Sequence, residues 1–197
     1  MIKAIFFDFN GVIIDDETIQ MKAYQEILRG HDVNITEEWY FDSLGMDDRT
    51  FVRSMFARAG KPLTDSVLES VMDAKTLMHR DIIKDELPLF PGVLTFLKST
   101  SREFALGLVS MANKNEVGYV FERAGLTPLF SVVVTAEDTN VCKPAPDCYA
   151  CGLEKLNEKR QHERQLPLLP SECLAIEASP PGIQSARAAG MRTLGVT

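Results

Sequence analysis

The sequence lacks the basic excess of a nucleic-acid-binding protein. Its 21 Lys and Arg residues are outnumbered by 28 Asp and Glu residues, which gives a formal net charge of −7. It also has no long run of basic residues, so no segment has the charge density that displaces counterions from a phosphate backbone. We therefore expect no nucleic-acid partner.

Long apolar segments are missing as well. No stretch approaches the ~18 consecutive apolar residues of a membrane-spanning helix. The N-terminus is a poor secretory signal, because Asp8 and Asn10 interrupt its apolar region. These features predict a soluble, cytoplasmic protein that does not bind membranes.

Cysteine is scarce, with four residues at Cys142, Cys148, Cys151 and Cys173. Cys148 and Cys151 have the C-x-x-C spacing of some metal and redox sites, but no second pair of this kind and no histidine pair follows. In DCYACGLEKL the same spacing also fits one face of an ordinary helix. We favour reduced, mostly buried thiols over a metal or redox centre.

The chain does have the composition of a folded protein. It contains 197 residues, of which 45% are hydrophobic and 25% are charged. This length suffices for one hydrophobic core, or for one core and a small second domain. The composition therefore favours a globular protein over a disordered or fibrous one.

Five short apolar runs predict the strands of a parallel sheet. They lie at residues 2–7, 104–109, 131–134, 173–176 and 193–196. Runs of this length and composition are typical of strands that are buried on both faces. Helical periodicity follows between them, as in the segment that ends at Gly125, a residue suited to a helix C-terminus. The alternation predicts a doubly wound, Rossmann-like α/β fold.

Residues 16–88 depart from this alternation. Apolar residues there recur at spacings of three and four, interrupted by Gly, Pro and Asp, in the segments 18–30, 37–45, 48–60 and 64–83. We predict four helices that form a small cap domain over 16–88, inserted after the first strand. The α/β core then comprises residues 1–15 and 89–197, and the proline-rich segment ELPLFPG leads back into it.

Polar residues follow the predicted strands at one side. Asp8 follows the first strand, Ser110 follows the second, and Glu177 follows the fourth, while Lys143 lies a little beyond the third. Taken singly, each could cap a turn or lie in solvent. In open parallel sheets, however, ligands bind beyond the carboxyl ends of the strands. One hydroxyl, one ammonium and two carboxylates there predict a site for an anion and a divalent cation.

The segments FDFNGVIIDDE, GLVSMANKNEV, CKPAPDCY and CLAIEASPPGIQSARAAGM, in this order, resemble the motifs of the haloacid dehalogenase superfamily. The resemblance covers essentially the whole chain. Within the superfamily it is closest to the capped phosphatase and β-phosphoglucomutase branch, whose small cap domain matches the helical insert. It implies a Mg²⁺-dependent phosphatase that acts on a small phosphorylated metabolite.

The resemblance implies roles for individual residues. Asp8 matches the nucleophile, which forms an aspartyl-phosphate that water then hydrolyses. The Ser110 hydroxyl, with backbone amides of Ser110, Met111 and Ala112, matches the group that binds the transferring phosphoryl group. Lys143 matches the cation that neutralises phosphate charge and holds the nucleophile in place.

Further implied roles concern the metal and the cap. The Mg²⁺ ligands would be the Asp8 carboxylate, the backbone carbonyl of Asn10 and an acidic position at Glu177. On the cap, Arg49 falls where the mutase branch has a phosphate-binding arginine. Gln20 stands where many relatives carry a histidine that assists proton transfer.

Two positions depart from the family pattern. Asn10 replaces the second Asp, which protonates the leaving group and later activates water in phosphatases of this family. An amide cannot exchange a proton at neutral pH, and loss of acid-base help typically costs about 10² to 10⁴ in rate. Ala178 stands where the family usually has a second acid in the metal motif. We predict a weakened Mg²⁺ site and impaired turnover.

Three functions follow from these observations. The first is the impaired phosphatase, the second is a catalytically weakened protein that binds a phosphorylated ligand, and the third is a β-phosphoglucomutase-like phosphotransferase, against which Gln20 weighs. The sequence leaves the substrate and the oligomeric state open. It also leaves open why the chain stops at Thr197, where similar proteins usually add a helical segment.

Overall fold

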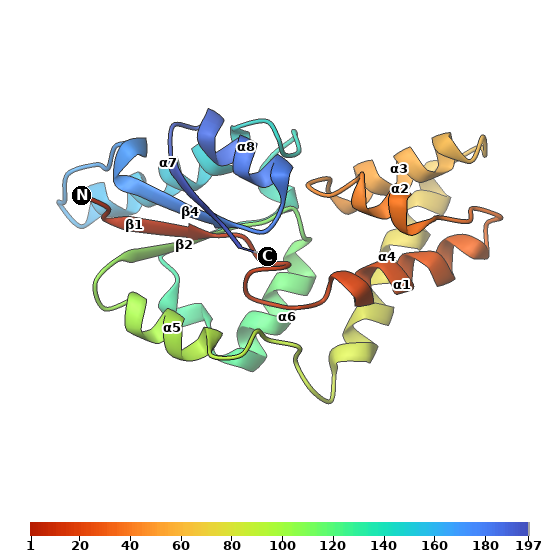
Figure 1. Cartoon of the computed structure of the whole chain (residues 1–197), viewed down its shortest axis with the longest axis horizontal. Coiled ribbons are helices and arrows are strands. Elements are labelled where there is room, and N and C mark those ends of the chain that lie inside the picture. Colours follow the sequence, from red (N-terminus) through yellow and green to blue (C-terminus); the bar gives the residue numbers. More distant parts are fainter. Residues whose placement is uncertain (197) are drawn as a thin grey trace.

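A five-stranded parallel sheet forms the centre of the core in the computed structural model, which describes residues 1–196 (Figure 1). The question raised by the chain end at Thr197 therefore lies outside the described residues. The strands are β1 (Ala4–Phe7), β2 (Ala105–Val109), β3 (Val132–Val134), β4 (Cys173–Glu177) and β5 (Arg192–Gly195). Their order is β3-β2-β1-β4-β5, and every neighbouring pair is parallel. The predicted parallel sheet is confirmed.

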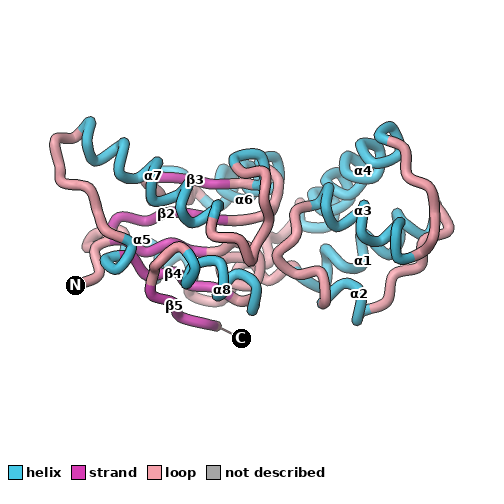
Figure 2. Tube along the Cα trace, turned by 90° about the horizontal axis from the view of Figure 1, so that it is seen from above, coloured by secondary structure: helices cyan, strands magenta, loops and turns pink. Residues whose placement is uncertain are grey.

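Helices cover both faces of this sheet, as Figures 1 and 2 show. One face is covered by α5 (Val93–Thr100) and α6 (Lys114–Ala124), and the other by α7 (Asp147–His162) and α8 (Pro180–Ala188). Three short 3-10 helices complete the core: η1 (Thr127–Leu129), η2 (Ala136–Asp138) and η3 (Pro170–Glu172). The predicted doubly wound arrangement is thus confirmed.

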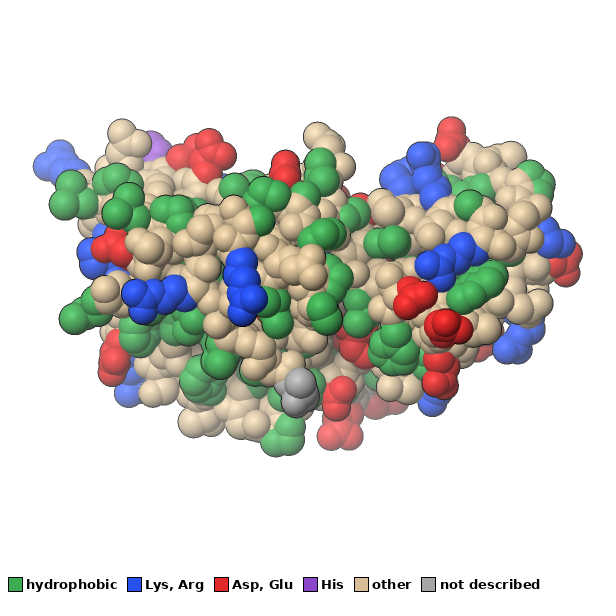
Figure 3. All heavy atoms as spheres, turned by 45° about the horizontal axis from the view of Figure 1, so that its top comes forward, with side chains coloured by type: hydrophobic (Ala, Val, Ile, Leu, Met, Phe, Trp, Pro, Cys, Tyr) green, Lys and Arg blue, Asp and Glu red, His purple; other side chains and the backbone are tan. Residues whose placement is uncertain are grey.

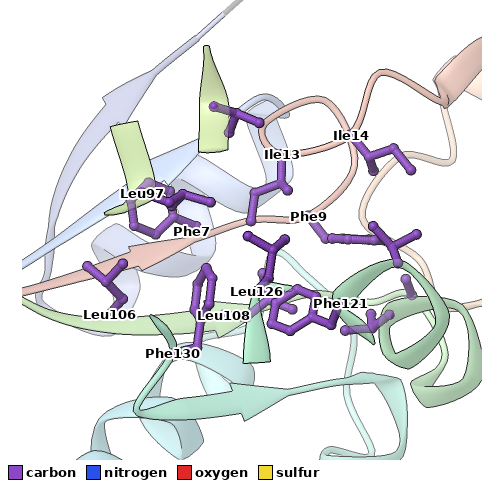
Figure 4. Packing of buried hydrophobic residues seen from close by; sticks show 14 of the residues in the cluster. Phe7, Phe9, Ile13, Ile14, Leu97, Leu106, Leu108, Phe121, Leu126 and Phe130 are labelled. Carbon is purple, nitrogen blue, oxygen red and sulfur yellow. The ribbon is translucent and has the colours of Figure 1, made fainter. Parts of the chain in front are cut away.

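Alternate residues of β1 enter two separate hydrophobic clusters. Ile5 and Phe7 pack on the α5 and α6 side, where the Phe7 ring meets the Phe130 ring edge to face with a centroid distance of 6.1 Å (Figure 4). Ala4 and Phe6 pack on the α7 and α8 side. Because successive strand residues point to opposite faces, an apolar run with no polar alternation is what a doubly covered strand requires.

Two glycines leave space for the ring of Phe6. A Cβ at Gly107 of β2 would lie 2.4 Å from the Phe6 ring, and a Cβ at Gly152 of α7 would lie 3.1 Å from it. Both glycines have ordinary negative φ, so their role is to admit the ring and not to allow an unusual backbone.

Four helices form the segment between β1 and α5, which we call the helical insert (residues 17–83). They are α1 (Glu17–Arg29), α2 (Glu37–Phe41), α3 (Asp48–Arg58) and α4 (Asp65–Ile83). The side chains of Thr36, Asp47 and Thr64 accept hydrogen bonds from backbone N–H groups at the starts of α2, α3 and α4. The insert has its own hydrophobic cluster, which includes residues of all four helices. Of the four, α2 is shorter than the pattern over 37–45 predicted.

The two chain segments that join insert and core run side by side. Asp15 donates its N–H to the Pro88 carbonyl, Phe90 donates to the Ile13 carbonyl, and Ile14 forms an antiparallel bridge with Leu89. This pairing makes the connection a two-stranded one.

No helix within residues 1–196 is long and apolar enough to cross a membrane. All four cysteines are free thiols, of which Cys148 and Cys173 are buried. Cys148 and Cys151 both lie on α7, as the helical interpretation of their spacing predicted.

Gly107→Ala is expected to lower the free energy of unfolding by about 1–3 kcal/mol, because the added methyl group would overlap the Phe6 ring. The matched control is Gly118→Ala in α6, where a Cβ meets no atom within 4 Å. That change should stabilise the protein by up to about 1 kcal/mol, since Ala favours helix over Gly. Urea unfolding measures both, and a Gly107→Ala protein as stable as wild type would contradict the packing described.

Candidate active site

Four polar side chains expected at the strand ends meet at one end of the sheet. The chain passes from β1 to β2 and β3 on one side and then returns to β4 and β5 on the other, so the crevice opens beside β1. Asp8 follows β1, Ser110 follows β2 and Glu177 ends β4, while Lys143 reaches the same place from the loop after β3. All four side chains are buried.

Lys143 links the two carboxylates. Its ammonium lies 3.1 Å from Asp8 Oδ1 and 2.6 Å from Glu177 Oε1. The Tyr149 hydroxyl donates to the same Glu177 oxygen at 2.7 Å, and the Ser179 hydroxyl donates to the other at 3.3 Å. The Glu177 carboxylate is therefore fixed in position by Lys143 and two hydroxyl groups, and it has no exposed surface.

The first turn of α8 makes room for this carboxylate. A Cβ at Gly182 would lie 2.0 Å from Glu177 Oε2, so only glycine fits at that position. Ser179 caps the helix by accepting from the Gly182 N–H at 3.1 Å. The N-terminus of α8, which is the positive end of the helix dipole, thus lies next to the buried Glu177 carboxylate.

The charged groups in this cluster shift one another's pKa values. Burial and the nearby Glu177 carboxylate raise the pKa of Asp8 well above its usual value, although Lys143 opposes the shift. Burial disfavours charge on Glu177 too, but Lys143 and the hydrogen bonds that Glu177 accepts hold its pKa below the ordinary value. Asp8 therefore depends on a neighbouring cation to stay ionised.

Ser110 begins a loop that can receive an anion. Its hydroxyl accepts a hydrogen bond from the Ala112 N–H at 3.0 Å, and Asn113 caps the start of α6 directly afterwards. Ser110, Met111 and Ala112 all line the cavity described next. Backbone amides at a helix start favour the binding of anions such as phosphate.

A cavity of about 270 Å³ lies between the core and the helical insert. Its core side carries Asp8, Asn10, Ser110, Lys143 and Ala178, and its other side is formed by residues of α1, α2, α3, α4 and the loop between α2 and α3. The outline of the molecule narrows where the two parts meet, and acidic side chains gather near this junction (Figure 3). The size fits a small-molecule ligand.

The loop between α2 and α3 covers the cavity beside Lys143. A Cβ at Gly45 would lie 3.0 Å from Pro181 Cβ and 3.2 Å from Lys143 Cβ, and Gly45 has a φ of 88°. Both the close approach and the positive φ therefore require glycine there. The insert is thus in direct contact with the loop that carries the predicted catalytic lysine.

Asn10 is held by an acid that the sequence had not singled out. Its Nδ2 donates to Asp16 Oδ1 at 2.8 Å. Asp16 has no exposed surface, and its other oxygen accepts from Gln20 Nε2 at 3.0 Å and from His79 Nε2 at 2.8 Å. Asn10 is accordingly part of a buried polar cluster that joins the first motif to α1 and α4.

Gly11 shapes the turn beside Asn10. Its φ is 74°, and a Cβ there would lie 2.7 Å from the Cβ of Ala178. The positive φ is one that glycine adopts readily, and the missing Cβ also lets two loops of the site approach closely.

A second buried cluster centres on Lys75 of α4. Its ammonium lies 3.0 Å from Asp48 Oδ1 and 2.8 Å from Glu116 Oε1, and it also donates to the second Glu116 oxygen at 2.9 Å. Asp48 belongs to the insert and Glu116 to α6 of the core, so this ion pair bridges the two parts. Burial disfavours the charge of Lys75, but Asp48 and Glu116 hold its pKa above the usual value.

Sequence reasoning missed Lys75 and His79, although a signal was present. Both occupy the buried stripe of α4, at the three- and four-residue spacing that otherwise holds apolar side chains; the stripe is Leu68, Val71, Lys75, His79 and Ile83. A polar residue in such a stripe must find buried partners. Those partners come from distant parts of the chain. The pattern could therefore show that Lys75 and His79 need buried partners, but not which residues these are.

Arg49 corrects one expectation. Its guanidinium pairs with Glu69 at 2.6 Å, and its side chain is 45% exposed. It does not line the cavity, whereas its neighbour Asp48 does. Adjacent helix residues point about 100° apart, so the side chain of Asp48 lines the cavity and that of Arg49, the expected phosphate-binding residue, does not.

The residues present do not fit a tightly held Mg²⁺ ion. Within residues 1–196 no cluster of three or more His, Cys, Asp or Glu side chains could hold a metal. Asp8 and the Asn10 carbonyl are available oxygens, but Glu177 is occupied by Lys143, Tyr149 and Ser179, and Ala178 offers only a methyl group. Mg²⁺ prefers six oxygen ligands, so this set is incomplete without water and substrate.

Asn10→Asp alone is expected to lower the free energy of unfolding by about 1–3 kcal/mol, because a carboxylate would face Asp16 where a hydrogen bond is now made. The paired change Asn10→Asp with Asp16→Asn restores an acid–amide pair and should recover most of this loss. Urea unfolding of both single variants and the double variant gives the coupling free energy. A coupling near zero would contradict the contact.

Comparison with known proteins agrees with this geometry. The model of the haloacid dehalogenase-like hydrolase family matches residues 2–190. The chain is 29% identical over 195 residues to the putative phosphatase YhcW of Bacillus subtilis (strain 168), covering 98% of this chain and 82% of YhcW.

Two solved structures share the fold. β-Phosphoglucomutase from Clostridium difficile superposes with a TM-score of 0.86 at 21% identity, covering 100% of this chain and 85% of that one. A CbbY mutant from Rhodobacter sphaeroides, in complex with xylulose-(1,5)bisphosphate, gives a TM-score of 0.83 at 23% identity, covering 99% and 86%. With its fold, its strand-end residues and the family match over nearly its whole length, the chain belongs to the haloacid dehalogenase-like hydrolases.

Proposed function

We propose that this protein is a phosphatase that hydrolyses a small phosphorylated metabolite through an aspartyl-phosphate on Asp8, with turnover reduced by Asn10 and Ala178. The observation that carries the proposal is the buried Lys143 ammonium 3.1 Å from Asp8 at the end of the central strand. Family membership and the likeness to YhcW support the same reaction class.

In the proposed reaction an Asp8 oxygen attacks phosphorus and the bond to the leaving-group oxygen breaks. Lys143 and the amides that follow Ser110 offset charge on the phosphoryl oxygens. Water then attacks the aspartyl-phosphate, which releases phosphate and regenerates the Asp8 carboxylate. Asn10 can neither protonate the leaving group nor take a proton from water, so both protons pass to or from solvent.

Mg²⁺, where bound, would add positive charge beside the phosphoryl group. Asp8 and the Asn10 carbonyl are the residues left to hold it, and no step of the proposed reaction depends on it. The alternative of a weakened binding protein is favoured by this incomplete ligand set and by Asn10. The mutase alternative requires a residue that binds a second phosphate, and Arg49, the expected residue, pairs with Glu69 and does not line the cavity.

Asp8→Asn is expected to reduce phosphate release from nitrophenyl phosphate by roughly 10³-fold or more, because it removes the nucleophile. The matched control is Arg49→Ala, which alters an exposed ion pair outside the cavity and should leave the rate within about twofold. Steady-state kinetics of the purified proteins measure both. If Asp8→Asn retained full activity, the proposed reaction would be wrong.

Ala178→Asp is expected to strengthen Mg²⁺ binding by about tenfold or more, because it adds a carboxylate at the cavity beside Asp8. Titration of the melting temperature and of phosphate release with Mg²⁺ gives the apparent affinity. Ala57→Asp, which adds the same charge at an exposed position of α3, is the control. Equal Mg²⁺ dependence in wild type and Ala178→Asp would refute the weakened site.

A further inference from the structure

The cavity lining has two chemically different parts. The core end carries Asp8, Lys143 and the segment from Ser110 to Ala112, which would receive a phosphoryl group. Lys143 is itself paired with two carboxylates, so the groups that favour an anion at this end are the backbone amides that precede α6. A second part of the lining carries three carboxyl groups, those of Glu17 and Asp48 from the insert and of Glu116 from α6, and a single ammonium, that of Lys75, which contacts Asp48 and Glu116. A substrate that fills the cavity would place its leaving group against this second part.

Lys75 has no donor left for a ligand. An ammonium group has three N–H bonds, and those of Lys75 are matched by three carboxylate oxygens, one of Asp48 and two of Glu116. The side chain is only 3% exposed. An incoming anion would therefore have to displace a buried carboxylate in order to reach Lys75.

The carboxylates in this part of the cavity outnumber the Lys75 ammonium even when Glu17 is left out of the count. Burial raises the pKa of Glu17, which reduces its charge, and the Tyr40 hydroxyl donates to it at 2.8 Å. Asp48 and Glu116 alone still exceed Lys75 by one negative charge. No other Lys or Arg among residues 1–196 lines this part of the cavity.

The polar groups in this part of the cavity are also mainly acceptors. Gln20 is 95% buried, and its Nε2 is occupied by Asp16 and Glu116 at 3.0 and 3.3 Å. Its Oε1 is the one buried side-chain polar atom without a partner among residues 1–196. The hydroxyls of Tyr24 and Tyr40 already donate to Asp48 and Glu17. A leaving group that fits must supply hydrogen-bond donors.

From this arrangement we propose that the leaving group of the substrate is an uncharged or cationic group rich in hydrogen-bond donors, such as a polyol or an amine, and carries neither a second phosphate nor a carboxylate. The proposal rests on the proposed function for the phosphoryl end of the cavity. It separates this chain from the CbbY structure that contains a bisphosphate, although the two share a fold.

The test uses three phosphate monoesters with the same six-carbon chain. Sorbitol phosphate, glucamine phosphate and phosphogluconate each carry phosphate at one end and differ at the other, where they have a hydroxyl, an amine or a carboxylate. Phosphate release gives kcat/KM for each, and ligand-induced shifts of the melting temperature give binding without turnover. The comparison of the three compounds uses wild-type protein.

The expected result is a kcat/KM for the hydroxyl or amine compound at least about tenfold above that for the carboxylate compound, because the carboxylates that line the cavity repel a third one. The relative rates of the hydroxyl and amine compounds tell whether a polyol or an amine is preferred. Equal or faster hydrolysis of phosphogluconate would overturn the inference and leave the phosphatase function standing.

Binding distinguishes the remaining outcomes. If none of the three is hydrolysed, but the hydroxyl or amine compound raises the melting temperature and phosphogluconate does not, the proposed function fails, and the inference stands as a binding preference of the cavity. If none binds and none is hydrolysed, both fail. Asp48→Asn should narrow the ratio between the carboxylate and hydroxyl compounds, whereas Glu69→Gln, which changes an exposed acid outside the cavity, should not.

Discussion

The site depends on one buried cation, the Lys143 ammonium held between Asp8 and Glu177. Two carboxylates this close would repel each other in a buried place without a cation between them. The sheet order places β1 beside β4 and so brings both acids together, and Gly182 leaves the space that Glu177 fills. The fold therefore keeps these three charged groups buried and in contact at the core side of the cavity.

The helical insert is joined to this centre by two buried polar clusters. One runs from Asn10 through Asp16 to His79, and the other pairs Lys75 with Glu116. Both clusters are largely shielded from solvent. Removing one member of a buried ion pair lowers the stability of the protein, because the other charge is then left without a partner. Asn10, which stands where the family resemblance predicts a second acid, donates a hydrogen bond to Asp16, so the amide has a structural partner in this chain.

Much of the fold followed from local patterns in the sequence. The five apolar runs, the stops at glycine and the polar strand ends depend on short-range regularities, and those regularities predicted the sheet and the residues that meet at its edge. The Asp48 and Arg49 pair shows the limit: the identity of the residue facing the cavity depends on a helix rotation of one position. The partners of Lys75 come from elements 27 and 41 residues away, which no local pattern encodes.

In the proposed reaction Asp8 accepts the phosphoryl group, and Asn10 leaves the second step without a base. Rapid mixing with nitrophenyl phosphate, whose leaving group needs no proton, should give a burst of nitrophenol equal to the enzyme present, followed by slower phosphate release. Acid-quenched protein should then carry one phosphoryl group on the peptide that contains Asp8. Release of nitrophenol and phosphate in step, with no phosphorylated Asp8 at any time, would contradict the account.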